Sequence, residues 1–143
     1  MDKNQYIFNA ETGESTCVLY TSFGKFVGKA KCCDEDRDML SEKTGLFIAE
    51  SRARIKALAA IRDKIKDELS GLKKYYYAVS QSKHYNESKY MEHMLKRHIM
   101  RLEHDLFLLR NDHYSEKETL RQFIRDKGEF YTKIRKNRQA NNG

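Results

Sequence analysis

The sequence predicts an α+β fold in which a small N-terminal antiparallel β-sheet of about three strands is followed by a long helical hairpin and a C-terminal helix. Three observations predict it. β-Branched and aromatic residues dominate the runs before residue 33, apolar residues recur every three or four positions after residue 46, and the 143 residues include no proline. Proline interrupts helices, and 34% of the residues are charged, which suits long exposed helix faces. The length leaves room for about one domain, residues 1–143.

The N-terminal sheet is predicted over residues 1–33. Its apolar runs are rich in residues that favour strands, and each connection between them contains a glycine. The runs are residues 6–8, 16–21 and 26–27, and the connections are residues 11–14 and 23–25. This pattern is typical of an antiparallel meander. So small a sheet is not stable by itself.

A long helix is predicted over residues 44–80, because its apolar residues are mostly three or four positions apart and therefore share one helix face. Gly71 lies inside this helix at a cost of about 1 kcal/mol relative to alanine, which a stripe of this length tolerates. Residues 80–86 are rich in turn formers and predict the reversal of a helical hairpin.

Two more helices are predicted after the reversal. The second covers residues 87–111, and its apolar stripe includes His98. A polar segment at residues 111–114 ends it, and an S-x-x-E capping pattern then predicts a third helix over residues 115–138, with residues 139–143 as a frayed tail. One small sheet and one hairpin partner cannot cover such long stripes, which predicts an oligomer formed through the helices.

The charge balance favours an anionic partner. The chain holds 28 Lys and Arg residues against 21 Asp and Glu residues, a net charge of +7. The two signs are interspersed along the chain, so a long nucleic acid is not the partner that we expect. The N-terminus has no apolar run of an export signal, and no segment approaches the ~20 apolar residues of a membrane span. No membrane association is therefore predicted.

Catalytic patterns are missing from the sequence. The five histidines lack the spacing of a metal site. The three cysteines, Cys17, Cys32 and Cys33, lack a CxxC pair and a histidine that the sequence places beside them. We therefore predict no enzymatic activity, no catalytic residue, no metal and no cofactor.

A group of residues around the predicted reversal has the chemistry of a nucleotide site. Tyr76 offers a ring that can stack on a base, and Asn86 offers an amide that can bind the edge of that base. Arg97 and Arg101 offer guanidinium groups that can bind a pyrophosphate. Tyrosines near a hairpin tip also serve as packing or interface residues, and this alternative stays open.

A second group of cations lies on the third predicted strand. Lys25, Lys29 and Lys31 are separated by even numbers of positions, so their side chains share one face of the sheet. These lysines form either a solvated face or a rim that faces phosphate groups.

Three segments resemble the phage-encoded anti-Thoeris proteins of the first type. They are FVGKAKC at residues 26–32, SEKTG at residues 41–45 and IAESRARIK at residues 48–56. The order of a small antiparallel sheet and long paired helices is also similar. The resemblance implies a non-enzymatic sponge that sequesters a cyclic ADP-ribose isomer, the messenger of bacterial TIR-domain defence. Some members of that family also bind the cyclic di- and trinucleotides of CBASS defence, so the resemblance implies these as further candidate ligands.

The resemblance also implies where the ligands bind. In that family the messenger pocket lies between helices of two protomers and uses an aromatic ring, an asparagine and arginines. These roles fall on Tyr76, Asn86 and Arg101 of this chain, with Arg97 as the alternative cation. A further nucleotide site would use the sheet and the first helix, and its residues would be Lys25, Gly28, Lys29, Arg52 and Arg54.

The same resemblance implies a cellular location and an oligomeric state. The protein would act in the host bacterial cytoplasm as a dimer built into a tetramer or hexamer.

Two alternative functions from other classes stay open. One is a phage inhibitor that binds a host defence protein, as anti-CRISPR proteins do. The other is a basic accessory protein that binds nucleic acid.

Overall fold

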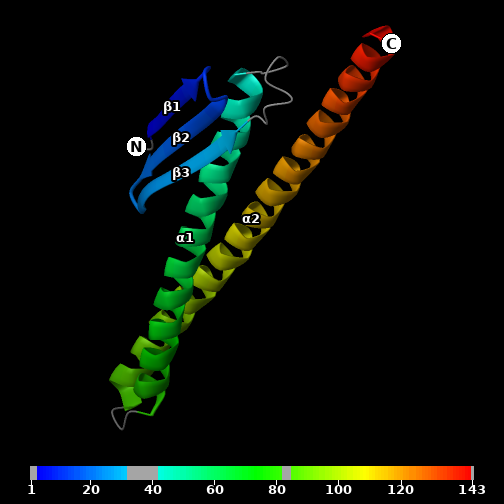
Figure 1. The fold of residues 1–143 in the computed structure, drawn as a ribbon. Helices are drawn as coiled ribbons and strands as arrows, with labels where there is room; N and C mark the ends of the chain where they lie inside the picture. The colour runs from blue at the N-terminus through cyan, green and yellow to red at the C-terminus, as the bar shows by residue number, and fades with distance from the viewer. Residues whose placement is uncertain (1–2, 32–41, 82–84, 143) are drawn as a thin grey trace. The chain divides into compact units, whose positions relative to one another are not determined.

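The computed structural model describes residues 3–31, 42–81 and 85–142 of the chain. Three strands precede two long helices, which confirms the α+β class (Figure 1). The elements are β1 (Lys3–Asn9), β2 (Glu14–Thr21), β3 (Gly24–Lys31), α1 (Glu42–Ser80) and α2 (Tyr85–Asn142). The residues form two compact units, and both helices pass through both units. The first unit contains Met1–Ala57 and Tyr114–Gly143, and the second contains Leu58–His113. That the whole chain acts as one domain stays a prediction.

The sheet is the antiparallel meander that the sequence predicts. Its strand order is β1-β2-β3, and Cys17 at the centre of β2 lies opposite Tyr6 and Gly28. The first connection needs a positive φ, which Gly13 supplies at 72°. The Asn9 side chain accepts the backbone N–H of Glu11 at 3.0 Å and so holds this turn.

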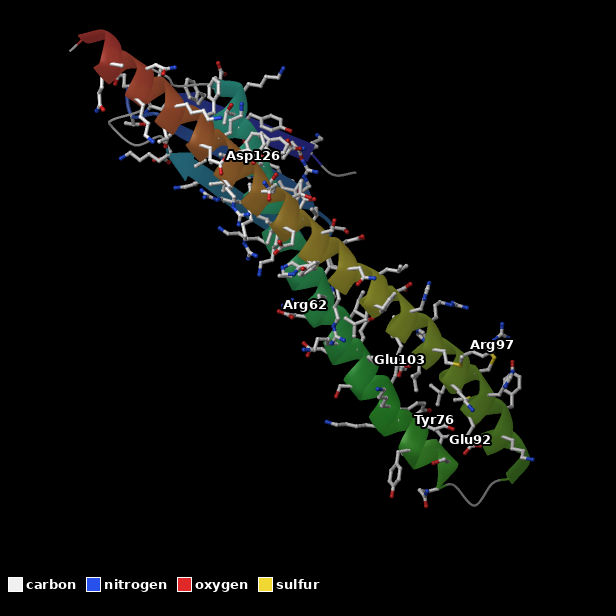
Figure 2. The ribbon with its side chains drawn as sticks, turned by 90° about the vertical axis from the view of Figure 1, so that its right-hand side faces the viewer. Arg62, Tyr76, Glu92, Arg97, Glu103 and Asp126 are labelled. Atoms are coloured by element: carbon white, nitrogen blue, oxygen red, sulfur yellow. The ribbon has the colours of Figure 1, made fainter. Side chains whose placement is uncertain are left out.

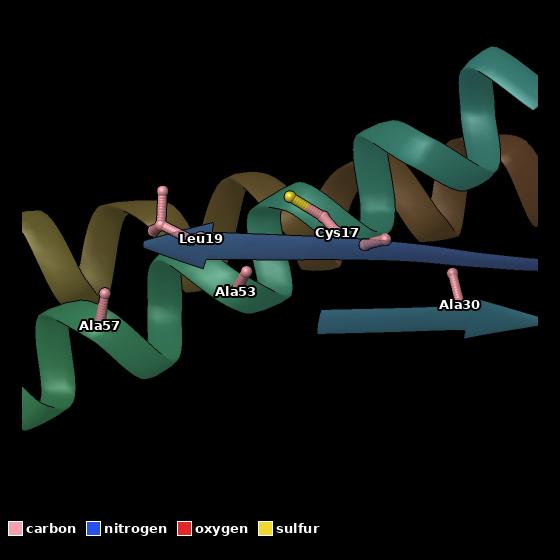
Figure 3. Close-up of a cluster of buried hydrophobic side chains, with 6 residues drawn as sticks. Cys17, Leu19, Ala30, Ala53 and Ala57 are labelled. Atoms are coloured by element: carbon pink, nitrogen blue, oxygen red, sulfur yellow. The ribbon is translucent and has the colours of Figure 1, made fainter. Parts of the chain in front are cut away.

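Small residues let α1 approach the sheet closely. Figure 3 shows the buried cluster between them, to which β2 contributes Cys17 and Leu19. The other members are all alanines, namely Ala30, Ala49, Ala53 and Ala57. A Cβ atom added at Gly28 would overlap the carbonyl oxygen of Ala49 and lie 2.5 Å from the backbone nitrogen of Ala53. The backbone of β3 therefore lies directly against the backbone of α1.

The C-terminal part of α2 also belongs to the first unit. The rings of Phe47 and Phe123 lie 4.4 Å apart between centroids, and Arg54 forms an ion pair with Glu116 at 3.7 Å. Leu120 is buried on the same part of the helix. This part of α2 thus packs on the first turns of α1.

The second unit is a pair of antiparallel helical segments with its own apolar seam. Its buried core is formed by Leu69 of α1 and three residues of α2, Ile99, Leu102 and Leu106. Ile65, Leu72 and Tyr76 pack against this core. The prediction that His98 lies in the seam is wrong, because the side chain is exposed and its neighbour Ile99 is buried instead.

The predicted boundary between a second and a third helix is wrong, because α2 is continuous from Tyr85 to Asn142. Residues 111–114 contain neither glycine nor proline, and their helix propensities cost only a few tenths of a kcal/mol each. Leu106 and Leu120, which are buried on either side of the segment, are two heptads apart, so the apolar face keeps its direction across it. The predicted frayed tail is helical up to Asn142.

The predicted starts of the two helices, at residues 44 and 87, agree with the structure to within one helical turn. The predicted start of the first helix at residue 44 lies within its first turn, and its end at Ser80 is confirmed. The predicted reversal at residues 80–86 is too long at its end, because α2 already begins at Tyr85. Residues 82–84 lie outside the described residues. The polar link after the sheet, together with Cys32 and Cys33, lies outside the described residues. Neither α1 nor α2, over the ranges described, holds an apolar stretch long enough to cross a membrane.

Candidate functional site

Arg97 and Arg101 lie one turn apart on α2 and line a common recess of about 370 Å³. Its apolar wall is formed by Met91, Met94 and Leu95, and His98 completes it. Met94 is 47% exposed, so the recess is open to solvent. Two guanidinium groups beside an apolar wall can bind an anion that also carries an apolar ring.

The two arginines are electrostatically unsatisfied. Like charges one turn apart repel each other by a few tenths of a kcal/mol in a helix. Within the described part of the chain, no carboxylate forms an ion pair with Arg97 or Arg101. A bound phosphate group would relieve this repulsion and could take bidentate hydrogen bonds from either side chain.

The structure does not bring the predicted aromatic residue to these arginines. Tyr76 is half-buried against the seam of the second unit, between its two helices (Figure 2). Arg97 extends from the side of α2 that faces away from α1 in this unit (Figure 2). Asn86 belongs to the first turn of α2, and its side chain lies outside the described residues. Within one protomer, the candidate site therefore consists of Arg97 and Arg101.

The residues of the second predicted nucleotide site are separated in the structure. Gly28 is buried under α1, where its lack of a side chain permits the close approach described above. Arg54 faces Glu50 at 3.3 Å and Glu116 at 3.7 Å. Lys25 is exposed at the N-terminal end of β3. Lys29 and Arg52 line a common recess.

Sequence reasoning missed Lys56, which acts together with Arg52 at the outer edge of β3. Arg52 donates to the carbonyl oxygen of Lys29, and Lys56 donates to the carbonyl oxygen of Val27, both at 2.6 Å. Arg52 and Lys56 are four residues apart on α1, and their partners on β3, Lys29 and Val27, are two residues apart. The i,i+4 spacing of these two cations on a helix that follows an edge strand is the sequence feature that could have indicated their role. Charged side chains at an edge oppose pairing with further strands.

Removing these edge contacts should weaken the first unit. We expect Arg52→Met and Lys56→Met each to lower the free energy of unfolding by about 0.5–1.5 kcal/mol, because the apolar stem stays and only the hydrogen bond is lost. Urea denaturation followed by circular dichroism measures this change. Lys43→Met, at an exposed position of the same helix, is the matched control and should be neutral. Equal effects at all three positions would contradict the role given to the edge.

Three lysines share the open face of β3, as predicted. Lys25, Lys29 and Lys31 are exposed, whereas Phe26 and Ala30 on the other face belong to the core or pack against it. Lys29 pairs with Glu14 at 3.8 Å, a surface contact worth little free energy. Binding of phosphate groups by this face stays a prediction.

Cys17 is enclosed by the core of the first unit, where none of its side chain is exposed. Burial raises the pKa of its thiol, the charge of Glu50 raises it further, and Arg54 opposes the shift. The thiol is therefore protonated near neutral pH and packs as a small apolar group. Residues 3–31, 42–81 and 85–142 contain no cluster of three or more His, Cys, Asp or Glu side chains placed to hold a metal ion.

Comparison with known proteins found no relative. No protein-family model, curated protein or solved structure matches this chain. The candidate site therefore rests on its own geometry and chemistry.

Proposed function

We propose that this chain is a phage-encoded immune-evasion protein that binds cyclic nucleotide second messengers and sequesters them uncleaved in the host bacterial cytoplasm. Its main ligand would be a cyclic ADP-ribose isomer of Thoeris signalling, with cyclic oligonucleotides of CBASS as further ligands. The observation that carries the proposal is that Arg97 and Arg101, which have no ion-pair partner among the described residues, lie together beside an apolar wall. The resemblance of residues 26–32, 41–45 and 48–56 to anti-Thoeris proteins supports it from the sequence.

The recess has the donors that such a messenger requires. A cyclic ADP-ribose isomer carries a pyrophosphate, which takes hydrogen bonds from guanidinium groups, and an adenine, which packs on apolar or aromatic surfaces. Sequestration needs only a dissociation constant below the concentration at which the host effector responds, at nanomolar or below. It needs no general base or nucleophile at the ligand.

A second copy of the chain would complete the recess. Tyr90, Met94 and Leu108 are 67%, 47% and 46% exposed, and their helical positions place them on the same side of α2 as Arg101. Covering this face with a second copy would bury the apolar side chains and could add an aromatic ring and an amide to the site. We therefore propose a dimer that is built into a tetramer or hexamer. Light scattering tests this, and a strict monomer at micromolar concentration would contradict it.

The proposed function is tested by release of an intact ligand. The purified protein should melt at a higher temperature in the presence of a cyclic ADP-ribose isomer, because the ligand binds only the folded state. After heat denaturation, chromatography and mass spectrometry should recover the isomer chemically unchanged. Recovery of a linear product would show cleavage and refute sequestration. No shift in melting temperature with any cyclic nucleotide would refute binding.

Arginine variants test the site itself. We expect Arg97→Ala and Arg101→Ala each to weaken binding of the isomer by about 1–3 kcal/mol, because each removes charged hydrogen bonds to phosphate. Isothermal titration calorimetry measures the loss. Lys96→Ala removes the same charge from the residue that precedes Arg97, whose side chain lies outside the recess, and this variant should bind normally. If all three variants bind alike, the recess is not the site.

A further inference from the structure

The second unit contains a larger hollow that no prediction from the sequence included. This hollow is a groove of about 770 Å³ between the 66–77 stretch of α1 and the 103–110 stretch of α2. Leu69 and Leu106, both buried in the seam, form its floor. The remaining lining side chains are polar or aromatic, namely Lys66, Ser70, Lys73, Lys74, Tyr77, Glu103 and Arg110. The volume falls within the range of small-molecule sites.

Positive charge gathers around this groove without compensation. Lys73 pairs with Glu103 at 3.3 Å. For Lys66, Lys74 and Arg110, the described residues supply no ion-pair partner. Three unpaired cations around one hollow lower the free energy of an anion inside it, and Arg110 can bind a phosphate with two hydrogen bonds.

Tyr77 gives the groove a flat apolar surface at its rim. The side chain is 68% exposed, although a tyrosine ring is costly to leave in water. It lies one turn after Lys73 and beside Lys74, so ring and cations share one side of α1. A ligand that combines a planar ring with phosphate groups would use both parts of this lining.

We propose that this groove is a binding site for nucleoside phosphates, with Tyr77 stacking on the base and Lys66, Lys74 and Arg110 binding the phosphates. The site is separate from the recess of Arg97 and Arg101, because the two hollows share no residue. On α2 they also lie on opposite sides of the seam residues Leu102 and Leu106, since each residue turns the helix by about 100°. The proposal does not depend on sequestration of cyclic messengers.

ADP, inorganic pyrophosphate and adenosine are the probes that test the groove. In calorimetric titrations without divalent cations, ADP should bind the full chain more tightly than either pyrophosphate or adenosine alone. The affinities for ADP and pyrophosphate should fall as salt is raised from about 50 to 200 mM, because the cations are exposed. A chain that binds no ADP at low salt overturns the proposal.

Variants with matched controls locate the binding. Tyr77→Leu should weaken ADP binding about fivefold and leave pyrophosphate binding unchanged, because it removes only the stacking surface. Tyr75→Leu is the control, since Tyr75 is also exposed but does not line the groove. Equal losses at the two tyrosines would overturn the proposal.

The phosphate contacts are tested by a double variant. The double variant Lys74→Ala/Arg110→Ala should lower the affinity for both ADP and pyrophosphate at least about tenfold. Lys89→Ala with Lys96→Ala removes the same charge from α2 outside the groove and should have little effect. If neither double variant changes ADP binding but Arg97→Ala abolishes it, the groove proposal fails and the recess is favoured. If the groove variants fail to bind ADP yet hold cyclic ADP-ribose isomers, both proposals stand separately.

Discussion

Gly28→Ala is expected to destabilise the first unit by about 3 kcal/mol or more. Overpacking a core usually costs 1–3 kcal/mol when a side chain can move aside. Here the added Cβ would meet backbone atoms, the carbonyl oxygen of Ala49 and the nitrogen of Ala53 at 2.5 Å. Neither atom can rotate away, so α1 would have to move off the sheet. That movement would also open the contacts of Ala53 with the core.

Gly71→Ala is the matched control, and the expected change has the opposite sign. Gly71 lies inside α1, and a Cβ added there would meet no atom within 4 Å apart from the backbone of its own helix turns. Alanine should therefore stabilise the helix by about 0.5–1 kcal/mol. Thermal and urea denaturation of the two variants give the comparison. If Gly28→Ala is as stable as the native chain, the close approach of β3 and α1 is wrong.

The fold was largely predictable because its signals are local. Strand-forming residues and a glycine in each connection suffice for the meander, and the spacing of apolar residues suffices for α1. The boundary at residues 111–114 was wrong because polar residues without proline or glycine weaken a helix only slightly. A helix that packs on other elements tolerates such a segment, and the local sequence does not show that packing.

The site was less predictable because it depends on which side of a helix each residue occupies. Successive helical residues point about 100° apart, so Tyr75, Tyr76 and Tyr77 face three directions. Tyr76 continues the apolar stripe of Leu69 and Leu72 that predicts the helix, and it packs on the seam as that spacing indicates. The cations of the groove come from segments more than twenty-five residues apart, such as Lys74 and Arg110, and meet only through the pairing of the two helices.

The three segments at residues 26–32, 41–45 and 48–56 contain residues that hold the sheet on α1. Gly28 and Ala30 lie in the first segment and Ala49 and Ala53 in the third, and all four take part in the close packing. Gly45, in the second segment, leaves room for the Ser15 side chain of β2. These residues are required by the packing whatever the protein binds. Packing alone therefore accounts for these residues, and the binding experiments decide the proposed function.

Leu102→Ala is expected to destabilise the second unit strongly. Leu102 is 9% exposed and packs with Leu69, Ile99 and Leu106 in the seam. Losing a buried leucine side chain costs about 2–5 kcal/mol, and the lower half of this range applies because a seam between two helices can partly collapse. Hydrogen exchange should then rise more in residues 58–113 than in β2, because the two units have separate cores.

The control for this variant also tests the assembly. Leu108→Ala makes the same substitution six residues further along α2, where the side chain is 46% exposed. In a dilute monomer it should cost less than about 0.5 kcal/mol, because little apolar surface leaves the core. If a second copy covers this face, the cost of Leu108→Ala should grow with protein concentration, whereas the packing loss at Leu102 should persist at every concentration. Equal costs at both positions in a dilute monomer would contradict the assignment of the seam. A cost at Leu108 that does not depend on concentration would contradict the proposed contact between copies.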